Sequence, residues 1–207
     1  MKFLLVFIIL SLFSVLISAS CTAPGTPLDG QYVFVTSTVH SGNLGGLAGA
    51  DAICQARADA TAFLGFPRVY KAWISNSTHS PAATFTTNSK TYARADGTVL
   101  ANSWTQFTSG TLLATPNMTE TCVSPPTGSA TGTMGAAGFI KTNTKYNGYA
   151  FWSTALCAEW TSTSFTGIRN IPFGNPASKN TWSLSVAPST DYADCTNLSP
   201  IYCVGQA

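Results

Sequence analysis

The sequence predicts a single domain of the α+β class, with one main helix near its N-terminus, short antiparallel strands and long disulfide-tied loops. Three observations support this class. A run rich in β-branched and aromatic residues at 31–39 predicts a first strand. Apolar residues three and four positions apart then predict a helix at about 47–63. The remaining chain has short strand-like runs between loops, with no internal repeat and no separable linker.

The predicted helix follows a glycine-rich turn at 41–49. Its apolar positions at helical spacing are Leu47, Ala50, Cys54 and Ala58. Gly65 and Pro67 are typical of a helix end. We therefore expect Cys54 on the buried face, where it can join the helix to a distant segment.

Beyond the helix, residues 69–75 predict a second strand. Residues 91–94 and 98–100 predict a hairpin across the Asp96-Gly97 turn. A long loop is expected at 124–138, where Gly, Ser, Thr, Ala and Pro predominate. Further strand-like runs lie at 150–154, 160–163, 181–186 and 201–204.

Residues 1–20 have the pattern of a secretory signal peptide, which leaves 21–207 as the single domain. Lys2 precedes an apolar stretch at 3–17, and small residues follow at 18–20. The two alternatives are an uncleaved anchor and a lipoprotein signal. An anchor needs about 20 apolar residues, and lipoprotein signals usually carry Leu where Ser18 stands. We expect a secreted, extracellular protein at a cell surface or in a matrix, with no integral membrane span after cleavage.

Charged residues make up only 9% of the chain, and its formal net charge is +2. An ordinary soluble domain has roughly 25%. The sequence contains 29 Thr and 22 Ser, so the surface should be neutral and rich in hydroxyl groups. Nucleic-acid binding needs clustered Lys and Arg, whereas the basic residues here are scattered singly. We therefore expect no nucleic-acid partner.

All six cysteines lie beyond the expected signal peptide, which predicts three disulfide bonds in an oxidising compartment. A zinc site would need paired ligands at short spacing with a His nearby, and this pattern is missing. Six cysteines allow fifteen pairings, among which spacing does not choose. The cysteines are Cys21, Cys54, Cys122, Cys157, Cys195 and Cys203.

Three sequons predict N-glycosylation at surface positions, at Asn76, Asn117 and Asn197. They matter only in a host with the eukaryotic secretory machinery. Such a host would make the protein a glycoprotein.

Catalytic patterns are weak, and we expect no enzyme activity and no cofactor. The turn at 41–49 lacks the spacing and the lysine of a nucleotide-binding loop, so a tight turn is the favoured interpretation. His40 is next to Ser41, but neighbours on a strand point to opposite faces. His79 is expected on an exposed loop. A calcium site would require Asp191, Asp194 and Glu159 to converge.

Four tryptophans lie in strand-like runs, which favours core positions over an exposed role in stacking on sugar rings. They are Trp73, Trp152, Trp160 and Trp182.

Several segments together resemble the secreted, mainly bacterial, endostatin-like domains, a group that includes the leptospiral endostatin-like surface proteins. The opening segment at 33–54 and the closing segment at 195–203 are the most specific. The other matching segments are 70–75, 94–98 with Trp104, and 157–162. This group is similar to the C-type lectins in fold. The resemblance therefore implies an endostatin-like or C-type-lectin-like fold.

The resemblance also implies the disulfide pairs Cys54–Cys203 and Cys157–Cys195, which leaves Cys21 with Cys122. The calcium-dependent sugar-binding motifs of C-type lectins are missing, since residues 174–176 are Gly-Asn-Pro and no Trp-Asn-Asp occurs. By the same resemblance, the loops between Asn76 and Gly148 would form a variable binding face.

These observations predict a non-catalytic module for adhesion or recognition, whose ligand is an extracellular glycan or a matrix or cell-surface protein. The alternative is a structural component of a wall, coat or surface layer that associates with copies of itself. A third hypothesis, a secreted hydrolase, would need His40 to meet an acid and a nucleophile.

Overall fold

The computed structural model describes residues 29–61, 64, 68–129, 139–164, 171–184 and 194–206. These ranges form a mixed α+β structure with one long helix, short helical turns and two small sheets. The expected signal peptide at 1–20 lies outside them. The elements are β1 (Gln31–Val35), α1 (Gly46–Asp59), β2 (Val69–Ala72), α2 (Pro81–Thr84), β3 (Tyr92–Arg94), β4 (Val99–Ala101), α3 (Trp104–Phe107), β5 (Ile140–Lys141), α5 (Cys157–Trp160), β6 (Phe173–Gly174) and β7 (Tyr202–Gln206).

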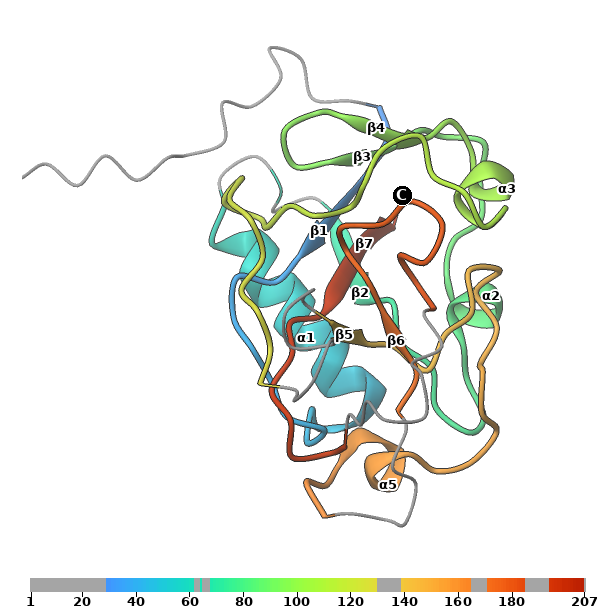
Figure 1. Ribbon diagram of the computed structural model, residues 1–207. Coiled ribbons are helices and arrows are strands. Elements are labelled where there is room, and N and C mark those ends of the chain that lie inside the picture. The colour runs from blue at the N-terminus through green and yellow to red at the C-terminus, as the bar shows by residue number, and fades with distance from the viewer. Residues whose placement is uncertain are drawn as a thin grey trace, which may run out of the picture.

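The main sheet has five strands in the order β2-β7-β1-β3-β4, so the first and last strands of the chain lie side by side at its centre (Figure 1). Strands β1 and β7 are antiparallel, with Phe34 opposite Cys203. Strands β1 and β3 are parallel, in contrast to the expected antiparallel strands. The long connection through α1 and β2 makes this possible, because parallel strands need a crossover. A second sheet pairs β5 with β6.

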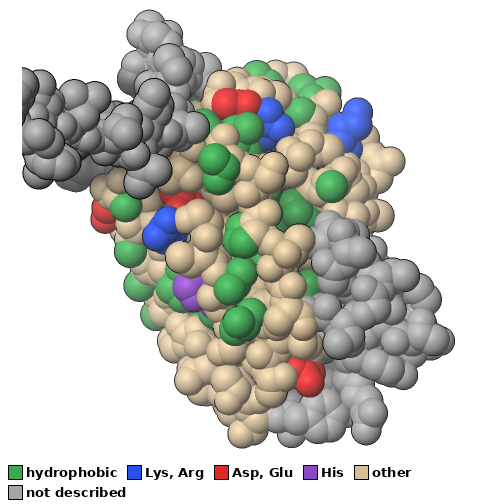
Figure 2. Space-filling view, turned by 60° about the vertical axis from the view of Figure 1, so that its left-hand side comes forward, with side chains coloured by type: hydrophobic (Ala, Val, Ile, Leu, Met, Phe, Trp, Pro, Cys, Tyr) green, Lys and Arg blue, Asp and Glu red, His purple; other side chains and the backbone are tan. Residues whose placement is uncertain are grey.

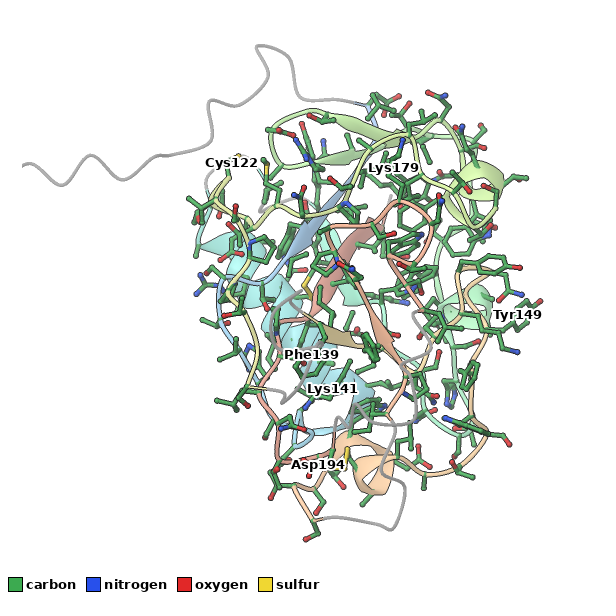
Figure 3. The ribbon with its side chains drawn as sticks, in the orientation of Figure 1. Cys122, Phe139, Lys141, Tyr149, Lys179 and Asp194 are labelled. Atoms are coloured by element: carbon green, nitrogen blue, oxygen red, sulfur yellow. A yellow bond between two sulfur atoms is a disulfide. The ribbon has the colours of Figure 1, made fainter. Side chains whose placement is uncertain are left out.

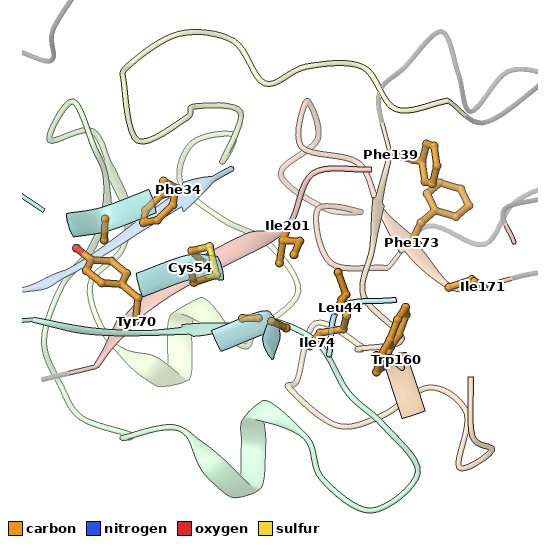
Figure 4. Close-up of a cluster of buried hydrophobic side chains, with 14 of the residues drawn as sticks. Phe34, Leu44, Cys54, Tyr70, Ile74, Phe139, Trp160, Ile171, Phe173 and Ile201 are labelled. Atoms are coloured by element: carbon orange, nitrogen blue, oxygen red, sulfur yellow. A yellow bond between two sulfur atoms is a disulfide. The ribbon is translucent and has the colours of Figure 1, made fainter. Parts of the chain in front are cut away.

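Both faces of the main sheet are buried, and side chains alternate between two cores. Tyr32 and Phe34 of β1 pack on one side with α1, and Figure 4 shows Phe34 in this cluster. Val33 and Val35 pack on the other side, in an aromatic cluster with Trp73. Every residue of β1 is buried, which explains the apolar run that follows Gln31 in this strand.

Helix α1 spans Gly46–Asp59 and buries Ala50, Cys54 and Ala58, as the apolar spacing predicts. It ends before the expected limit of 63, and Arg57 lies in its last turn. Strand β1 also ends earlier than predicted, at Val35. The hydroxyl group of Thr36 donates a hydrogen bond to the carbonyl oxygen of Thr38 at 2.7 Å, which turns the chain there.

Two disulfide bonds join distant segments of this fold. Cys54 of α1 is bonded to Cys203 of β7, 149 residues later. Cys157 is bonded to Cys195, 38 residues later. These are the two pairs that the resemblance implies. Cys122 is also disulfide-bonded, but its expected partner Cys21 lies outside the described residues, so that pairing stays a prediction.

The strand predictions at 150–154 and 160–163 fail, whereas the one at 201–204 is confirmed by β7. Residues 150–154 form no strand apart from a single bridge between Ala150 and Thr144. Residues 181–184 are irregular, and 185–186 lie outside the description. Trp160 ends the short helical turn α5 instead of starting a strand. Aromatic content suggested strands here, but propensity alone provides no partner strand.

The short helices α2 and α3 were not predicted. Ser80-Pro81 begins α2, with Pro at its first helical position. The side chain of Ser103 caps α3 by accepting a hydrogen bond from the Gln106 backbone N–H. Over the described ranges, no helix has the length and the apolar character needed to cross a membrane.

Candidate recognition surface

Residues 145–152, hereafter the aromatic loop, carry three large aromatic side chains exposed to solvent. Tyr146 is 45% exposed, Tyr149 is 59% exposed and Trp152 is 44% exposed. Tyr149 projects from the edge of the molecule (Figure 3). Trp152 is at right angles to the ring of Phe151, with 4.9 Å between the ring centroids. Such a concentration of exposed aromatic surface is typical of a binding site.

Asn143, which is fully buried, holds one end of the aromatic loop. Its side-chain nitrogen donates hydrogen bonds to the carbonyl oxygens of Ser75 and Trp152, at 3.3 and 3.0 Å. Its side-chain oxygen accepts a hydrogen bond from the Trp152 backbone N–H at 2.9 Å. The φ angle of Asn143 is 47°, a left-handed conformation that Asn tolerates better than most residues. One amide therefore fixes the backbone beneath Trp152.

Two glycines allow the rest of the aromatic loop to pack closely on its neighbours. Tyr146 lies against Gly110, where an added Cβ atom would come within 3.3 Å of the ring. The carbonyl oxygen of Gly148 accepts a hydrogen bond from the Ala82 backbone N–H of α2 at 3.0 Å. Both glycines have positive φ angles, which favour this residue type. The exposed rings are thus carried on a backbone held at several points.

Trp152 corrects the expectation that all four tryptophans in strand-like runs are core residues. Trp73, Trp160 and Trp182 are fully buried, but Trp152 is not. The exposed position could have been suspected from its neighbours, because Asn147 and Gly148 together with three aromatic residues resemble a turn more than a strand. The buried role of Asn143 had no signal in the sequence.

The glycine-rich turn at 41–49 serves to pack the chain closely. A Cβ atom on Gly42 would lie 2.5 Å from the sulfur of Cys157, and one on Gly49 would lie 2.0 Å from the Leu44 carbonyl oxygen. Gly45 and Gly46 have φ angles of 78° and 75°. Each glycine has a structural reason, in agreement with the tight-turn interpretation.

His40 and Ser41 do not form the contact that a hydrolase would use. Instead, Nε2 of His40 is 2.9 Å from the hydroxyl oxygen of Thr38. Burial lowers the pKa of His40, and the positive charge of Arg57 acts in the same direction. The buried Glu120 is engaged elsewhere, with Arg57 and Ser37. His79 lies on an exposed turn, as expected.

The acids proposed for a calcium site have separate partners. Glu159 accepts a hydrogen bond from the Ser77 backbone N–H at 3.1 Å. Asp194 accepts hydrogen bonds from the Thr196 and Asn197 backbone N–H groups. Asp191 lies outside the described residues. Within the described ranges, no three His, Cys, Asp or Glu side chains gather as a metal site would require.

The three sequons differ in their surroundings. The side-chain oxygen of Asn76 accepts hydrogen bonds from the backbone N–H groups of Thr78 and His79 in an exposed turn. Asn117 is bonded to Arg94, and Asn197 donates to the Ser129 carbonyl oxygen. Glycosylation at each of them stays a prediction.

A buried lysine lies beside the last of these sequons. Lys141 of β5 is 4% exposed, and its amine donates a hydrogen bond to the Asn197 carbonyl oxygen. Burial lowers the pKa of Lys141 to about 8, and the nearby Asp194 carboxylate acts in the opposite direction. Figure 3 labels both residues.

The surface is largely neutral around these features. In the view of Figure 2, blue and red side chains are few among neutral groups. This agrees with the low charge content of the sequence.

Comparison with known proteins gives a family without an assigned activity. The family described as "Protein of unknown function (DUF1554)" matches residues 37–176, which is more than half of the chain. No curated protein matches the sequence. The matched range includes α1, the short helices α2, α3 and α5, and the aromatic loop. On this match, the chain belongs to the DUF1554 family of proteins of unknown function.

Proposed function

We propose that the protein is a non-catalytic module for adhesion or recognition, secreted or exposed at a cell surface, whose ligand is an extracellular glycan or protein. The aromatic loop is the observation that supports this proposal. Three exposed aromatic side chains lie within seven residues, on a backbone held by Asn143, Gly110 and Gly148. A rigid platform loses less entropy on binding than a mobile one.

The chemistry of Tyr and Trp suits both classes of ligand. Each ring offers a flat apolar face that packs on the C–H face of a sugar or on an apolar side chain, and a polar group that can form a hydrogen bond. The surroundings are neutral and rich in hydroxyl groups. We therefore expect contacts dominated by packing and neutral hydrogen bonds, with a weak dependence on salt.

A C-type-lectin-like or endostatin-like fold is part of the proposal. Several features support it: the first and last strands pair at the centre of the main sheet, and a helix follows the first strand. That helix is bonded to the last strand through Cys54–Cys203. The second disulfide, Cys157–Cys195, lies inside this span.

Export from the cytoplasm is the other part of the proposal. Disulfide bonds persist in oxidising compartments and are rare in the cytosol. The pattern at residues 1–20, typical of a secretory signal, supports the same location.

The second candidate function is self-association in a wall, coat or surface layer. Apolar side chains outside the aromatic loop are also exposed, and they provide surface for packing of identical copies. These residues are Val69, Leu113, Val123 and Leu198. Concentration-dependent oligomers without a ligand would favour this role.

A binding screen tests the proposed function. The oxidised protein is applied to a glycan array and a panel of matrix proteins, with and without EDTA, at low and high ionic strength. We expect saturable binding that persists in EDTA and changes little with salt. Strong loss of binding at high salt would contradict the neutral recognition surface. Hydrolysis of a bound substrate that disappears in His40→Ala would replace recognition with catalysis.

A further inference from the structure

A pocket of about 340 Å³ opens between α1, β2 and α2, and none of its lining residues belongs to the aromatic loop. This volume is at the small end of the range for ligand sites, about 300–1,000 Å³. Both charged and apolar side chains line it. The ten lining residues include Asp51, Lys71 and His79 among the polar ones, and Leu47, Ile74 and Phe85 among the apolar ones.

Asp51 supplies an acceptor in the pocket. One carboxylate oxygen accepts a hydrogen bond from the Ala72 backbone N–H at 2.8 Å. Among the described residues, no hydrogen bond reaches the second oxygen. Burial raises the pKa of Asp51, whereas the charge of Lys71 opposes this shift. A half-buried carboxylate with an open oxygen favours a ligand that donates hydrogen bonds.

Lys71 supplies donors on the other side. Its amine donates to the carbonyl oxygen of Thr84 at 2.6 Å and lies 6.0 Å from the centre of the Phe85 ring. An ammonium group has three N–H donors, so this hydrogen bond leaves two for a ligand. The positive charge of Lys71 balances the negative charge of Asp51, and the pocket has no excess charge to select an ion.

One wall of the pocket is apolar. Ile74 is 3% exposed and is one of its lining residues. Phe85 is held in place by Trp73, whose ring lies at right angles to it with 5.7 Å between the centroids. Leu47 of α1 completes this wall. A ligand therefore meets an apolar surface beside an acceptor and a donor.

We propose that this pocket binds one or two neutral sugar units of the glycan that the protein recognises. The inference rests on the proposed recognition role and specifies its ligand. A sugar hydroxyl can donate to Asp51 and accept from Lys71, while the C–H face of the ring covers Phe85 and Leu47. The balanced charges disfavour an acidic or basic sugar, because either one would leave a charge in the pocket without a partner.

The test uses methyl glycosides of mannose, galactose and N-acetylglucosamine as probes for the oxidised protein. Binding is followed by NMR shifts of the backbone amides. We expect the largest shifts at Ala48 and Ile74, which line the pocket. Glycine is the control probe, because a zwitterion could instead pair with the two charges. Shifts at the pocket with glycine and none with any glycoside would overturn the assignment.

Variants at exposed helix positions separate the pocket from the fold. Ala48 lines the pocket and is exposed, whereas Ala56 is exposed on the same helix two turns later, outside the pocket. We expect Ala48→Trp to weaken glycoside binding at least about tenfold by filling the pocket, and Ala56→Trp to leave it unchanged. Asp51→Asn keeps an acceptor for Ala72 but removes the charge, and we expect about a tenfold loss.

The outcomes distinguish this inference from the proposed function. Glycan binding that is lost in aromatic-loop variants but unchanged in Ala48→Trp would reject the pocket and keep the recognition role. No binding of any glycoside, glycan or matrix protein would reject both. Loss of binding in Ala48→Trp with a native near-ultraviolet circular dichroism spectrum would support the pocket.

Discussion

A single buried amide organises the candidate recognition surface. Asn143 has no charge and no motif to distinguish it in the sequence, yet it bonds the backbone at both Ser75 and Trp152. Its left-handed conformation adds a second requirement. Tertiary contacts of this kind depend on segments 68 residues apart, so local patterns could not predict them.

Replacing Asn143 by Ala should destabilise the protein and loosen the aromatic loop. The Trp152 backbone N–H and carbonyl oxygen lose their partner, at a cost of about 1–3 kcal/mol, whereas the Ser75 carbonyl oxygen keeps its hydrogen bond from the Trp160 indole N–H. The check is the free energy of unfolding in urea. Asn143→Gly is the matched control, since Gly accepts the φ angle of 47° but forms none of these bonds. Full stability in Asn143→Gly would show that the hydrogen bonds are unimportant.

Lys141 predicts an unusual dependence of stability on pH. Burial lowers its folded-state pKa to about 8, from 10.5 in the unfolded chain. Between pH 8 and pH 10.5 the unfolded state binds more protons than the folded state. The free energy of unfolding should therefore rise as the pH increases from 8. Burial raises the pKa of Tyr70, Tyr92 and Tyr202, which removes stability above about pH 10 as the unfolded tyrosines ionise.

The measurement is the urea midpoint at several pH values from 7 to 9.5, for the wild type and Lys141→Met. The variant should lack the rise above pH 8, because Met does not titrate. Identical pH profiles for the two proteins would show that Lys141 is well solvated.

At the scale of elements, α1 protects an edge of the main sheet. Strand β2 lies at an edge of the sheet. Two of its outward backbone N–H groups, which could otherwise pair with a strand of another chain, donate to side chains of α1. Gln55 accepts a hydrogen bond from the Tyr70 N–H at 2.9 Å, and Asp51 accepts one from the Ala72 N–H at 2.8 Å. Asp51 and Gln55 are one helical turn apart, and this spacing lets them reach two alternate residues of the strand. Covering an edge in this way prevents aggregation.

Removing one of these acceptors should open the edge. Gln55→Ala leaves the Tyr70 N–H without its partner, and we expect its hydrogen exchange to accelerate by about tenfold or more. Gln55→Glu retains an acceptor at the same position and should exchange nearly as slowly as the wild type. Equal rates in wild type and Gln55→Ala would mean that the helix does not cap this edge.

The sequence predicted elements well where the local pattern and the tertiary packing agree. Helix α1 and the β3–β4 hairpin satisfy both conditions. The predicted strand at 160–163 does not, because its aromatic residue, Trp160, is the last residue of the segment 157–160. This segment forms a turn in which all four residues have positive φ angles of 50–65°, between the Cys157–Cys195 bond and the buried Trp160. No local preference predicts a left-handed turn of non-glycine residues.

At the scale of the molecule, one disulfide links the helical layer to the centre of the sheet. Cys54–Cys203 joins residues 149 positions apart, and both are fully buried. Cys54→Ala with Cys203→Ala should lower the free energy of unfolding by about 4–5 kcal/mol. Denaturant unfolding checks this, with Cys157→Ala and Cys195→Ala as the comparison, since their separation of 38 predicts a smaller loss. A loss below that of the shorter disulfide would contradict this explanation.

The α+β class and the cysteine-bearing face of α1 were predictable because they depend on periodic patterns in the sequence. The pocket was not predictable, because its residues converge from separate segments. The pocket combines residues of α1, β2 and α2. The end of the aromatic loop was assigned to a strand at 150–154 because exposed and buried tryptophans look the same in sequence.

The recognition role can be tested most directly by comparing the wild type with Tyr149→Ala/Trp152→Ala in the glycan and matrix-protein screen. Both residues are exposed, at 59% and 44%, so the double variant should fold normally. We expect the wild type to bind a ligand and the variant to lose most of that binding, by about tenfold or more. Unchanged binding by the variant would contradict a role for the aromatic loop in recognition.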